Sequence, residues 1–219
     1  MRELLLDVAR DEKRSFLFVG AHCDDIEIGC GGAVTRLVER FPDAHYTWVV
    51  LCSDATRAME ARAGAAAFLT DVANTSVMIS EFRDGFLPYI GGEVKDFFED
   101  LKQRVSPDVI FTHNRADAHQ DHRLVCELTW NTFRDHLIFE YETPKYDGDL
   151  GTPNLFLELS QAQCEQKIET IHSCYPSQHS HGWFTPETFR GLMRLRGIEC
   201  NAGGGYAEAF YSRKARLAI

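Results

Sequence analysis

Apolar residues recur along the chain with two different spacings. Short runs rich in β-branched and aromatic residues predict strands, and apolar residues at helical intervals predict helices. Strands are expected at residues 16–19, 45–52, 75–82, 108–112 and 137–142, and helices between them at 33–40, 56–69, 93–105 and 119–134. Strands that alternate with helices are typical of a mostly parallel sheet covered on both faces. We therefore expect an α/β fold, a Rossmann-like three-layer sandwich.

The last third of the chain continues this alternation after an interruption. Residues 143–153, rich in Pro, Gly and Asp, predict a loop. A strand at 155–159, a helix at 161–174, an irregular segment at 175–185, a helix at 187–196 and a strand at 206–211 are expected to follow. The length of 219 residues fits a single domain over residues 1–219.

Charge, hydropathy and cysteine usage indicate which partners, location and thiol state to expect. Against 23 basic residues stand 33 acidic ones, a net charge of -10, which argues against nucleic acids and anionic membrane surfaces. No apolar segment approaches a membrane span, and residues 1–14 reach charged positions before a signal-peptide core could form, so a cytoplasmic location is expected. Seven scattered cysteines, without a C-x-x-C pair, predict reduced and mostly buried thiols.

A polar cluster follows the first expected strand. His22, Asp24 and Asp25 come within six residues of its end, just before closely spaced glycines. Ionisable groups at the end of a buried strand are costly to desolvate, so a divalent metal is the expected partner. His22 and Asp25 can face one ion, which leaves Asp24 free to transfer protons.

A second polar cluster follows the fourth expected strand, within residues 112–123. His119, Asp121 and His122 stand at the expected start of a helix, where the helix dipole favours carboxylates. Sites in parallel sheets lie beyond the carboxyl ends of the strands, so both clusters are expected in one crevice. Two histidines and one aspartate from two loops make an open zinc site, with the fourth position left for water.

The two clusters resemble the motifs of the PIG-L/LmbE-like zinc-dependent N-deacetylases. The first family motif, Ala-His-Pro-Asp-Asp followed by a Glu and glycines, is matched by residues 21–25, Glu27, Gly29, Gly31 and Gly32. The second, His-x-x-Asp-His preceded by Thr-His and Asp, is matched by residues 119–122, Thr112, His113 and Asp117. Weaker matches are Arg57 with Glu60, Asp84 with Gly85, and Ser177 with Gln178. The resemblance covers roughly the first four-fifths of the chain.

The resemblance implies a role for each matched residue. It implies that zinc is held by His22, Asp25 and His122 and activates a water, with Asp24 as general base. A protonated His119, kept charged and oriented by Asp121, would stabilise the oxyanion. The leaving amine could be protonated by Asp24 or by His119, and the sequence does not decide between them.

The resemblance also implies a substrate. It is the N-acetyl group of an amino sugar or glycoconjugate, with Arg57 and Asp84 as contacts. The loops at 143–153 and 175–185, the second with Tyr175, Trp183 and Phe184, are expected to line the pocket. Relatives assemble into rings or dimers, so a homo-oligomer is also possible.

The residues themselves leave other interpretations open. Adjacent aspartates often form turns or helix caps, and the segment 119–122 could be a solvated helix start. Arg57 fits a salt bridge with Glu60 as well as a substrate contact. Glu27 is expected to brace the turn, and His113 to hydrogen-bond rather than bind metal. Cys23, at the position of the family proline, could loosen the turn or compete as a ligand.

Other functions remain as alternatives. A dinucleotide fingerprint is not met, because Val34 takes the place of the last glycine and the two aspartates would repel a pyrophosphate. A non-catalytic metal-binding protein would need no free carboxylate at Asp24. Within the enzymes, an amidase acting on a thiol or sugar conjugate stays possible, and Fe²⁺ or another divalent metal could replace zinc.

Overall fold

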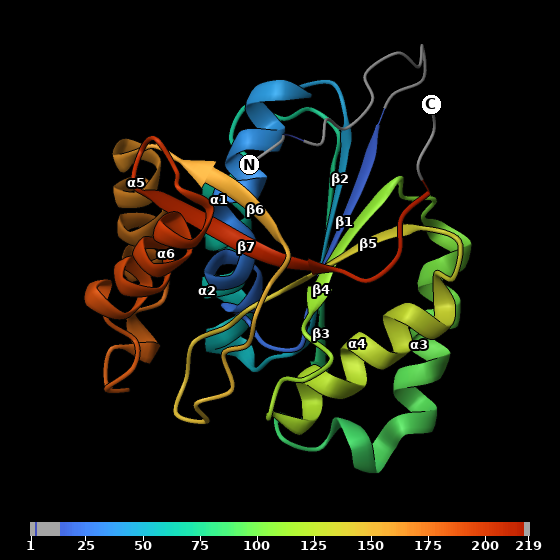
Figure 1. The fold of residues 1–219 in the computed structure, drawn as a ribbon. Helices are drawn as coiled ribbons and strands as arrows, with labels where there is room; N and C mark the ends of the chain where they lie inside the picture. The colour runs from blue at the N-terminus through green and yellow to red at the C-terminus, as the bar shows by residue number, and fades with distance from the viewer. Residues whose placement is uncertain (1–2, 4–13, 217–219) are drawn as a thin grey trace.

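The computed structural model describes residue 3 and residues 14–216, which form a mostly parallel seven-stranded sheet between helices (Figure 1). The strands are β1 Ser15–Gly20, β2 His45–Cys52, β3 Thr75–Phe82, β4 Val109–His113, β5 Leu137–Tyr141, β6 Leu155–Leu159 and β7 Tyr206–Ser212. Their order is β3-β2-β1-β4-β5-β7-β6, with β1 to β5 parallel and β7 antiparallel to both of its neighbours. The predicted α/β fold class is therefore confirmed.

Helices cover both faces of the sheet. They are α1 Asp25–Arg40, α2 Ala55–Phe68, α3 Gly91–Arg104, α4 Gln120–Thr132, α5 Gln161–Cys174 and α6 Pro186–Cys200, with short 3₁₀ helices η1 Leu87–Ile90 and η2 Pro176–Gln178. Helices α3 and α4 lie on one face, and α1, α2, α5 and α6 on the other (Figure 1).

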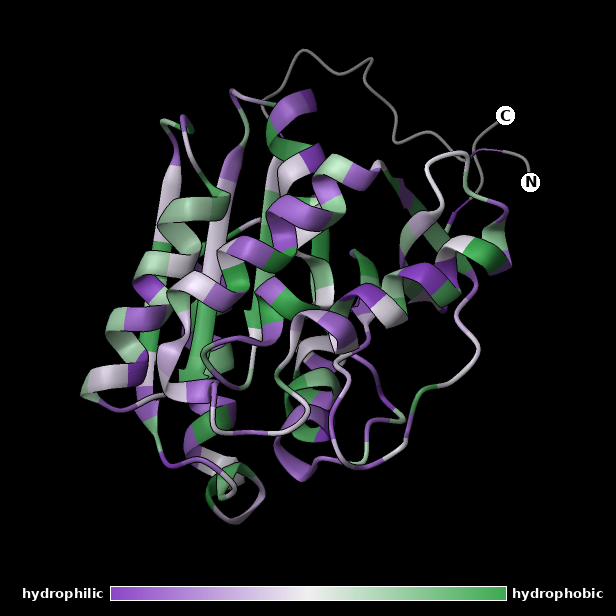
Figure 2. Ribbon diagram, turned by 90° about the vertical axis from the view of Figure 1, so that its left-hand side faces the viewer, coloured by the Kyte–Doolittle hydropathy of each residue, from purple (hydrophilic) through white to green (hydrophobic). Residues whose placement is uncertain are grey.

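The two cores follow from the period of two along each strand. In β1, Phe16 and Phe18 pack in the core on the α1 face, whereas Leu17 and Val19 pack in the core on the α3 face. Figure 2 shows the strands as hydrophobic bands behind helices of mixed polarity. Because both faces are buried, the central strands are apolar at almost every position.

Helix α1 begins at Asp25, not at Ala33 as expected, and is broken at Cys30, whose φ of -146° is not helical. The glycines of this segment lower its intrinsic helix propensity, but packing overrides propensity here. A Cβ on Gly29 would lie 2.1 Å from Cδ2 of Tyr141. Only glycine lets the first part of α1 approach β5 this closely.

The break in α1 is stabilised by a buried ion pair from distant elements. Lys167 of α5 and Glu208 of β7 are 2.6 Å apart. Lys167 Nζ donates to the carbonyl of Ile28 at 2.6 Å, and Glu208 accepts the N–H groups of Gly32 and Ala33 at 2.6 and 2.7 Å. These bonds satisfy backbone groups that lose their partners at the break.

Other expectations concern location and redox state. All seven cysteines are free thiols and six are buried, as expected. Among the described residues, no helix is both long and apolar enough to cross a bilayer. The cytoplasmic location and the single domain over residues 1–219 stay predictions, and most of residues 1–14 lie outside the described part of the chain.

Candidate active site

A cleft of about 680 Å³ opens at the carboxyl ends of the parallel strands. Its walls come from the segments that follow β1, β2 and β3, from the start of α4, and from residues 143–147 and 178–183. Strand β1 pairs with β2 on one side and β4 on the other, so the cleft lies where the strand order reverses. This is the usual position of ligand sites in open α/β sheets.

The residues expected to bind metal meet at the floor of this cleft. His22 Nδ1 lies 3.1 Å from His122 Nε2 and 3.4 Å from Asp25 Oδ2. His122 Nε2 lies 3.4 Å from Asp25 Oδ1. His22 and Asp25 lie beside the first turn of α1, and His122 lies in the first turn of α4, so two loops distant in sequence supply the cluster.

Neighbouring carboxylates fix which ring nitrogens face this cluster. His122 Nδ1 lies 2.9 Å from Asp117 Oδ2, so Nδ1 carries the donated proton and Nε2 keeps a lone pair. His22 Nε2 lies 3.0 Å from Asp84 and 3.3 Å from Asp121, so its Nδ1 is the nitrogen left for a metal. Burial lowers the pKa of His122 to about 4, against the opposing effect of Asp25, so this ring is neutral.

These donors fit a divalent metal such as zinc. Zinc bonds of about 2.0–2.2 Å in a tetrahedron place ligand atoms about 3.3 Å apart, close to the observed separations. Burial opposes a charge on His22, but Asp25, Asp121 and Asp84 outweigh it and raise its pKa. Without a metal, a protonated His22 thus supplies the positive charge among these carboxylates. The ligand atoms of His22, Cys52 and Asp121 also lie within 4.8 Å of one another, and the sequence had not singled out Cys52.

Asp24 stands beside the cluster without joining it. Its Oδ1 lies 2.9 Å from Arg57 Nη2, and its buried Oδ2 has no hydrogen-bond partner among the described residues. Burial raises the pKa of Asp24, the Arg57 charge opposes this, and the Asp25 charge adds to it. A carboxylate with a raised pKa and a free oxygen is suited to take up and return a proton.

The expected arrangement of His119 and Asp121 needs correction. The Asp121 carboxylate does not contact the His119 ring: it accepts the N–H groups of Gly85 and Leu87, at 2.7 and 3.1 Å, and approaches His22. Instead, the backbone N–H of Asp121 donates to His119 Nδ1 at 3.3 Å. Burial and the nearby charge of His22 lower the pKa of His119, so a neutral ring with its proton on Nε2 is favoured over the expected imidazolium.

Glu27 lies behind the metal cluster rather than in the cleft. It is fully buried and accepts a hydrogen bond from the Tyr175 hydroxyl, and its expected role in bracing the turn stays a prediction. Tyr175 and Phe184 are also buried in the core, so the expectation that they line the pocket is wrong. Trp183 does line the cleft.

Burial of Glu27 predicts a pH dependence of stability. Desolvation raises its pKa from 4.5 to about 8, so the folded protein keeps a proton that the unfolded chain releases near pH 4.5. The stability associated with this proton is present below pH 4.5 and is lost as the pH rises toward 8. We expect Glu27→Gln, which keeps an acceptor for Tyr175, to weaken the fall in stability over this range in chelator-treated protein.

Denaturant unfolding at about pH 5 and about pH 8 measures this effect. The exposed Glu127→Gln is the matched control and should leave the pH dependence of wild type unchanged. Parallel pH dependences of wild type and Glu27→Gln would contradict the prediction.

His113 occupies the position expected of a hydrogen-bonding neighbour. Its Nε2 lies 3.1 Å from Asp25 Oδ2 and accepts the N–H of Ala21 at 2.9 Å. This bond uses the lone pair that a metal would need. Asp25, His113 and His122 still lie within ligand distance of one another, so the ligand set stays a prediction.

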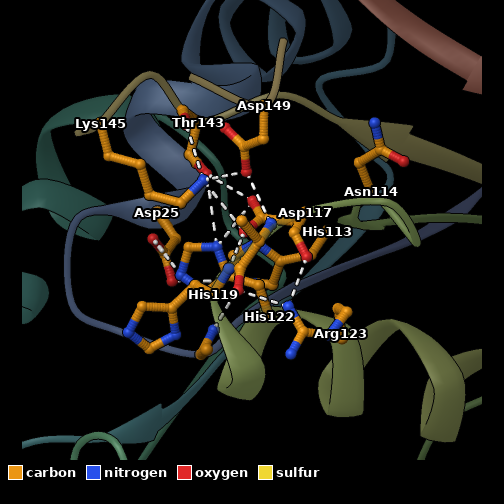
Figure 3. A network of polar contacts seen from close by, with 12 residues as sticks. Asp25, His113, Asn114, Asp117, His119, His122, Arg123, Thr143, Lys145 and Asp149 are labelled. Atoms are coloured by element: carbon orange, nitrogen blue, oxygen red, sulfur yellow. Dashed lines mark hydrogen bonds and ion pairs between the residues drawn. The ribbon is translucent and has the colours of Figure 1, made fainter. Parts of the chain in front are cut away.

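A loop lysine contacts the aspartate that holds His122 (Figure 3). Asp117, whose Oδ2 contacts His122, lies with its Oδ1 3.0 Å from Lys145 Nζ. Lys145 also lies 2.7 Å from Asp149, which in turn accepts the N–H of Ala118 at 2.7 Å. The sequence motif included Asp117 without a role, and Lys145 was missed because nothing in a Pro- and Gly-rich loop indicates its partner.

Replacing Lys145 should weaken metal binding. Without its ammonium group Asp117 is less firmly held against His122, and such supporting contacts are typically worth about tenfold or more in metal affinity. We expect Lys145→Met to raise the zinc dissociation constant about tenfold, and Lys145→Arg to restore most of the loss. Competition with a chromophoric chelator measures this; Lys95→Met, at an exposed pair on α3, is the control. Equal affinities of wild type and Lys145→Met would contradict it.

The remaining expected residues also border the cleft. Arg57 contacts Asp24 and, at 2.9 Å, Glu60, so the salt bridge considered for it is present. Asp84 is largely exposed at the mouth. The Cys23 thiol donates to the carbonyl of Cys52 at 3.2 Å, and burial raises its pKa to about 12, so it stays protonated.

Comparison with known proteins places this site in a family. The sequence profile of the family described as PIG-L, GlcNAc-PI de-N-acetylase, matches residues 17–133, more than half of the chain. The chain belongs to the PIG-L family. Among curated proteins, none matches the chain significantly.

Solved structures show how widely the PIG-L fold is shared. The conserved protein TT1542 from Thermus thermophilus is 23% identical, with 93% of this chain and 96% of that chain covered and a TM-score of 0.74. N,N'-diacetylchitobiose deacetylase from Pyrococcus horikoshii is 20% identical, with 90% and 82% covered and a TM-score of 0.67. GalB, a 4-carboxy-2-hydroxymuconate hydratase from Pseudomonas putida, is 18% identical, with 94% and 98% covered and a TM-score of 0.75. At these identities the likeness shows the fold alone.

Proposed function

We propose that this protein is a metal-dependent hydrolase that removes the N-acetyl group from an N-acetylated amino sugar or glycoconjugate. The observation that carries the proposal is the convergence of His22 Nδ1, His122 Nε2 and the Asp25 carboxylate beside Asp24, in one open cleft. Family membership supports the deacetylase reaction, and a structural neighbour named as a chitobiose deacetylase supports a sugar substrate.

The residues of the site would have three roles: to bind the metal, to transfer a proton and to stabilise the developing charge. His22, Asp25 and His122 would hold the ion, and bound zinc would supply Lewis acidity for the attacking water and the acetamide carbonyl. Asp24 would take the proton of the attacking water on its free Oδ2. The raised pKa of Asp24 makes this proton transfer less unfavourable than it would be for an ordinary aspartate.

His119 would act as a neutral hydrogen-bond donor. Because its Nδ1 accepts the Asp121 N–H, its Nε2–H is free to donate to the carbonyl oxygen as negative charge develops there. A neutral ring has no second proton to spare, so the leaving amine would receive its proton from Asp24. Between the two donors that the sequence left open, we therefore propose Asp24.

Residues at the mouth of the cleft suit a sugar. Trp183 lines it, and the Tyr146 hydroxyl accepts the N–H of Gly182 at 3.2 Å, which joins the two loops above the site. Aromatic side chains bury the apolar faces of sugar rings. Arg57 and Asp84 remain the proposed substrate contacts.

Acetate release tests the proposal directly. Zinc-loaded protein, with its metal content verified, would be incubated with N-acetylglucosamine, its methyl glycosides and N,N'-diacetylchitobiose. We expect acetate and free amine in equal amounts from at least one of them. No acetate from any of these compounds would contradict the proposal, and amine release from a thiol conjugate alone would favour an amidase.

A further inference from the structure

We propose that the cleft selects acetamido sugars that carry no phosphate, so that free sugars or neutral glycosides are substrates and sugar phosphates, nucleotide sugars and phosphoinositide glycolipids are not. The inference rests on the deacetylase function proposed above and concerns the charge of its substrate. Three features of the cleft carry it: a carboxylate rim, helix N-termini with carboxylates beside them, and cations that are already paired or stacked.

The rim of the cleft is acidic. Four exposed carboxylates line it, from the carboxyl ends of three strands: Asp54 after β2, Glu81 and Asp84 at the end of β3, and Asp147 after β5. A phosphate at the mouth would meet carboxylates on several sides. Clefts lined by one sign of charge repel ligands of the same sign.

Helix N-termini, the usual phosphate sites of α/β proteins, have the chain's own carboxylates beside them at this cleft. At α2, Asp54 accepts the N–H of Arg57 at 2.8 Å. The first turn of α1 holds Asp25 and Glu27, and the first turn of α4 holds Asp121. These three helix starts border the cleft, and each has a carboxylate beside its N–H groups.

The cations of the cleft are also committed to other groups. Arg57 is held between Asp24 and Glu60, and Lys145 between Asp117 and Asp149. Binding a phosphate would require breaking these pairs and leaving buried carboxylates uncompensated.

The third cation lining the cleft, Arg83, packs against an aromatic ring. Its guanidinium lies 3.6 Å from the centre of the Phe86 ring. The rim thus carries four carboxylates and one stacked arginine that forms no ion pair with any residue the structure describes, so the mouth of the cleft keeps an excess of negative charge.

A matched pair of substrates tests the inference. The values of kcat/KM for acetate release would be compared for the methyl α-glycoside of N-acetylglucosamine and for N-acetylglucosamine α-1-phosphate, with zinc-loaded protein. We expect the neutral glycoside to be favoured at least about tenfold at low ionic strength, and the ratio to shrink as salt screens the rim.

Rim variants test the cause. Glu81→Gln combined with Asp147→Asn should shift the ratio toward the phosphate substrate by about threefold or more. Asp96→Asn combined with Glu127→Gln removes the same charge from exposed positions on α3 and α4 and should leave the ratio unchanged. A remote pair that shifts the ratio equally would show an effect of net charge and overturn the role of the rim.

Two further outcomes are distinguishable. Equal or faster turnover of the 1-phosphate at low ionic strength would overturn the inference while leaving the proposed deacetylase intact. No acetate from either compound, or from the other sugars tested, would remove the proposed function and this inference with it.

Discussion

Replacing Asp24 with asparagine should lower kcat for acetate release by about 10²–10⁴-fold, the range typical of a lost general acid–base group. Asparagine keeps an oxygen that can accept from Arg57 but cannot take up the proton of the attacking water. Asp24 does not contact His22 or His122, so the variant should still bind zinc with near wild-type affinity. Steady-state kinetics together with metal analysis of the same sample measures both.

Asp54→Asn is the matched control, because Asp54 also lines the cleft and asparagine caps a helix as well as aspartate does. Its kcat should stay close to wild type. Turnover retained in Asp24→Asn would point to another base or to a non-catalytic metal-binding protein. Loss of metal together with turnover would assign Asp24 to the ligands instead.

Removing the metal should abolish activity. We expect chelation to lower turnover by at least about a thousandfold, because Lewis-acid stabilisation is worth several kcal/mol, and added zinc to restore it. His122→Gln should lose the metal and the activity together, since its Nε2 faces both His22 and Asp25. His181→Gln, at another histidine lining the cleft, should change neither.

Metal analysis of protein purified without added metal tests the identity of the ion. Zinc is the expected result. Iron accompanied by oxygen-dependent turnover would contradict a hydrolase, because two histidines and a carboxylate also serve iron oxygenases. Full activity after chelation, with the metal shown to be gone, would contradict any metal-dependent mechanism.

Most of the fold could be predicted because its central strands are buried on both faces and stand out as apolar runs. The start of α1 could not, since glycines at positions 29, 31 and 32 lower helix propensity while the contacts that compensate come from Tyr141 and Glu208, far along the chain. Local sequence carries no information on such distant partners.

The candidate site could be predicted where residue types alone indicate chemistry. Residue types indicated His22 and Asp25, the family resemblance selected His122 from the second cluster, and the three lie together. The supporting network could not be predicted, because Lys145 reaches Asp117 only after β4 and β5 pair. Tyr175 was misplaced for a related reason: an aromatic residue in a loop looks available for a ligand, but its hydroxyl is bound by Glu27 inside the core.

Through the ion pair of Lys167 and Glu208, the turn at residues 22–25 depends on α5 and β7, which come much later in the chain. A fragment ending near residue 133 would retain every proposed ligand and Asp24, yet would lack the groups that hold the two halves of α1 at Cys30. Such a fragment would carry the family's sequence signature without a fixed orientation of the turn at residues 22–25. A shorter segment is therefore expected to lose this orientation unless both α5 and β7 are kept.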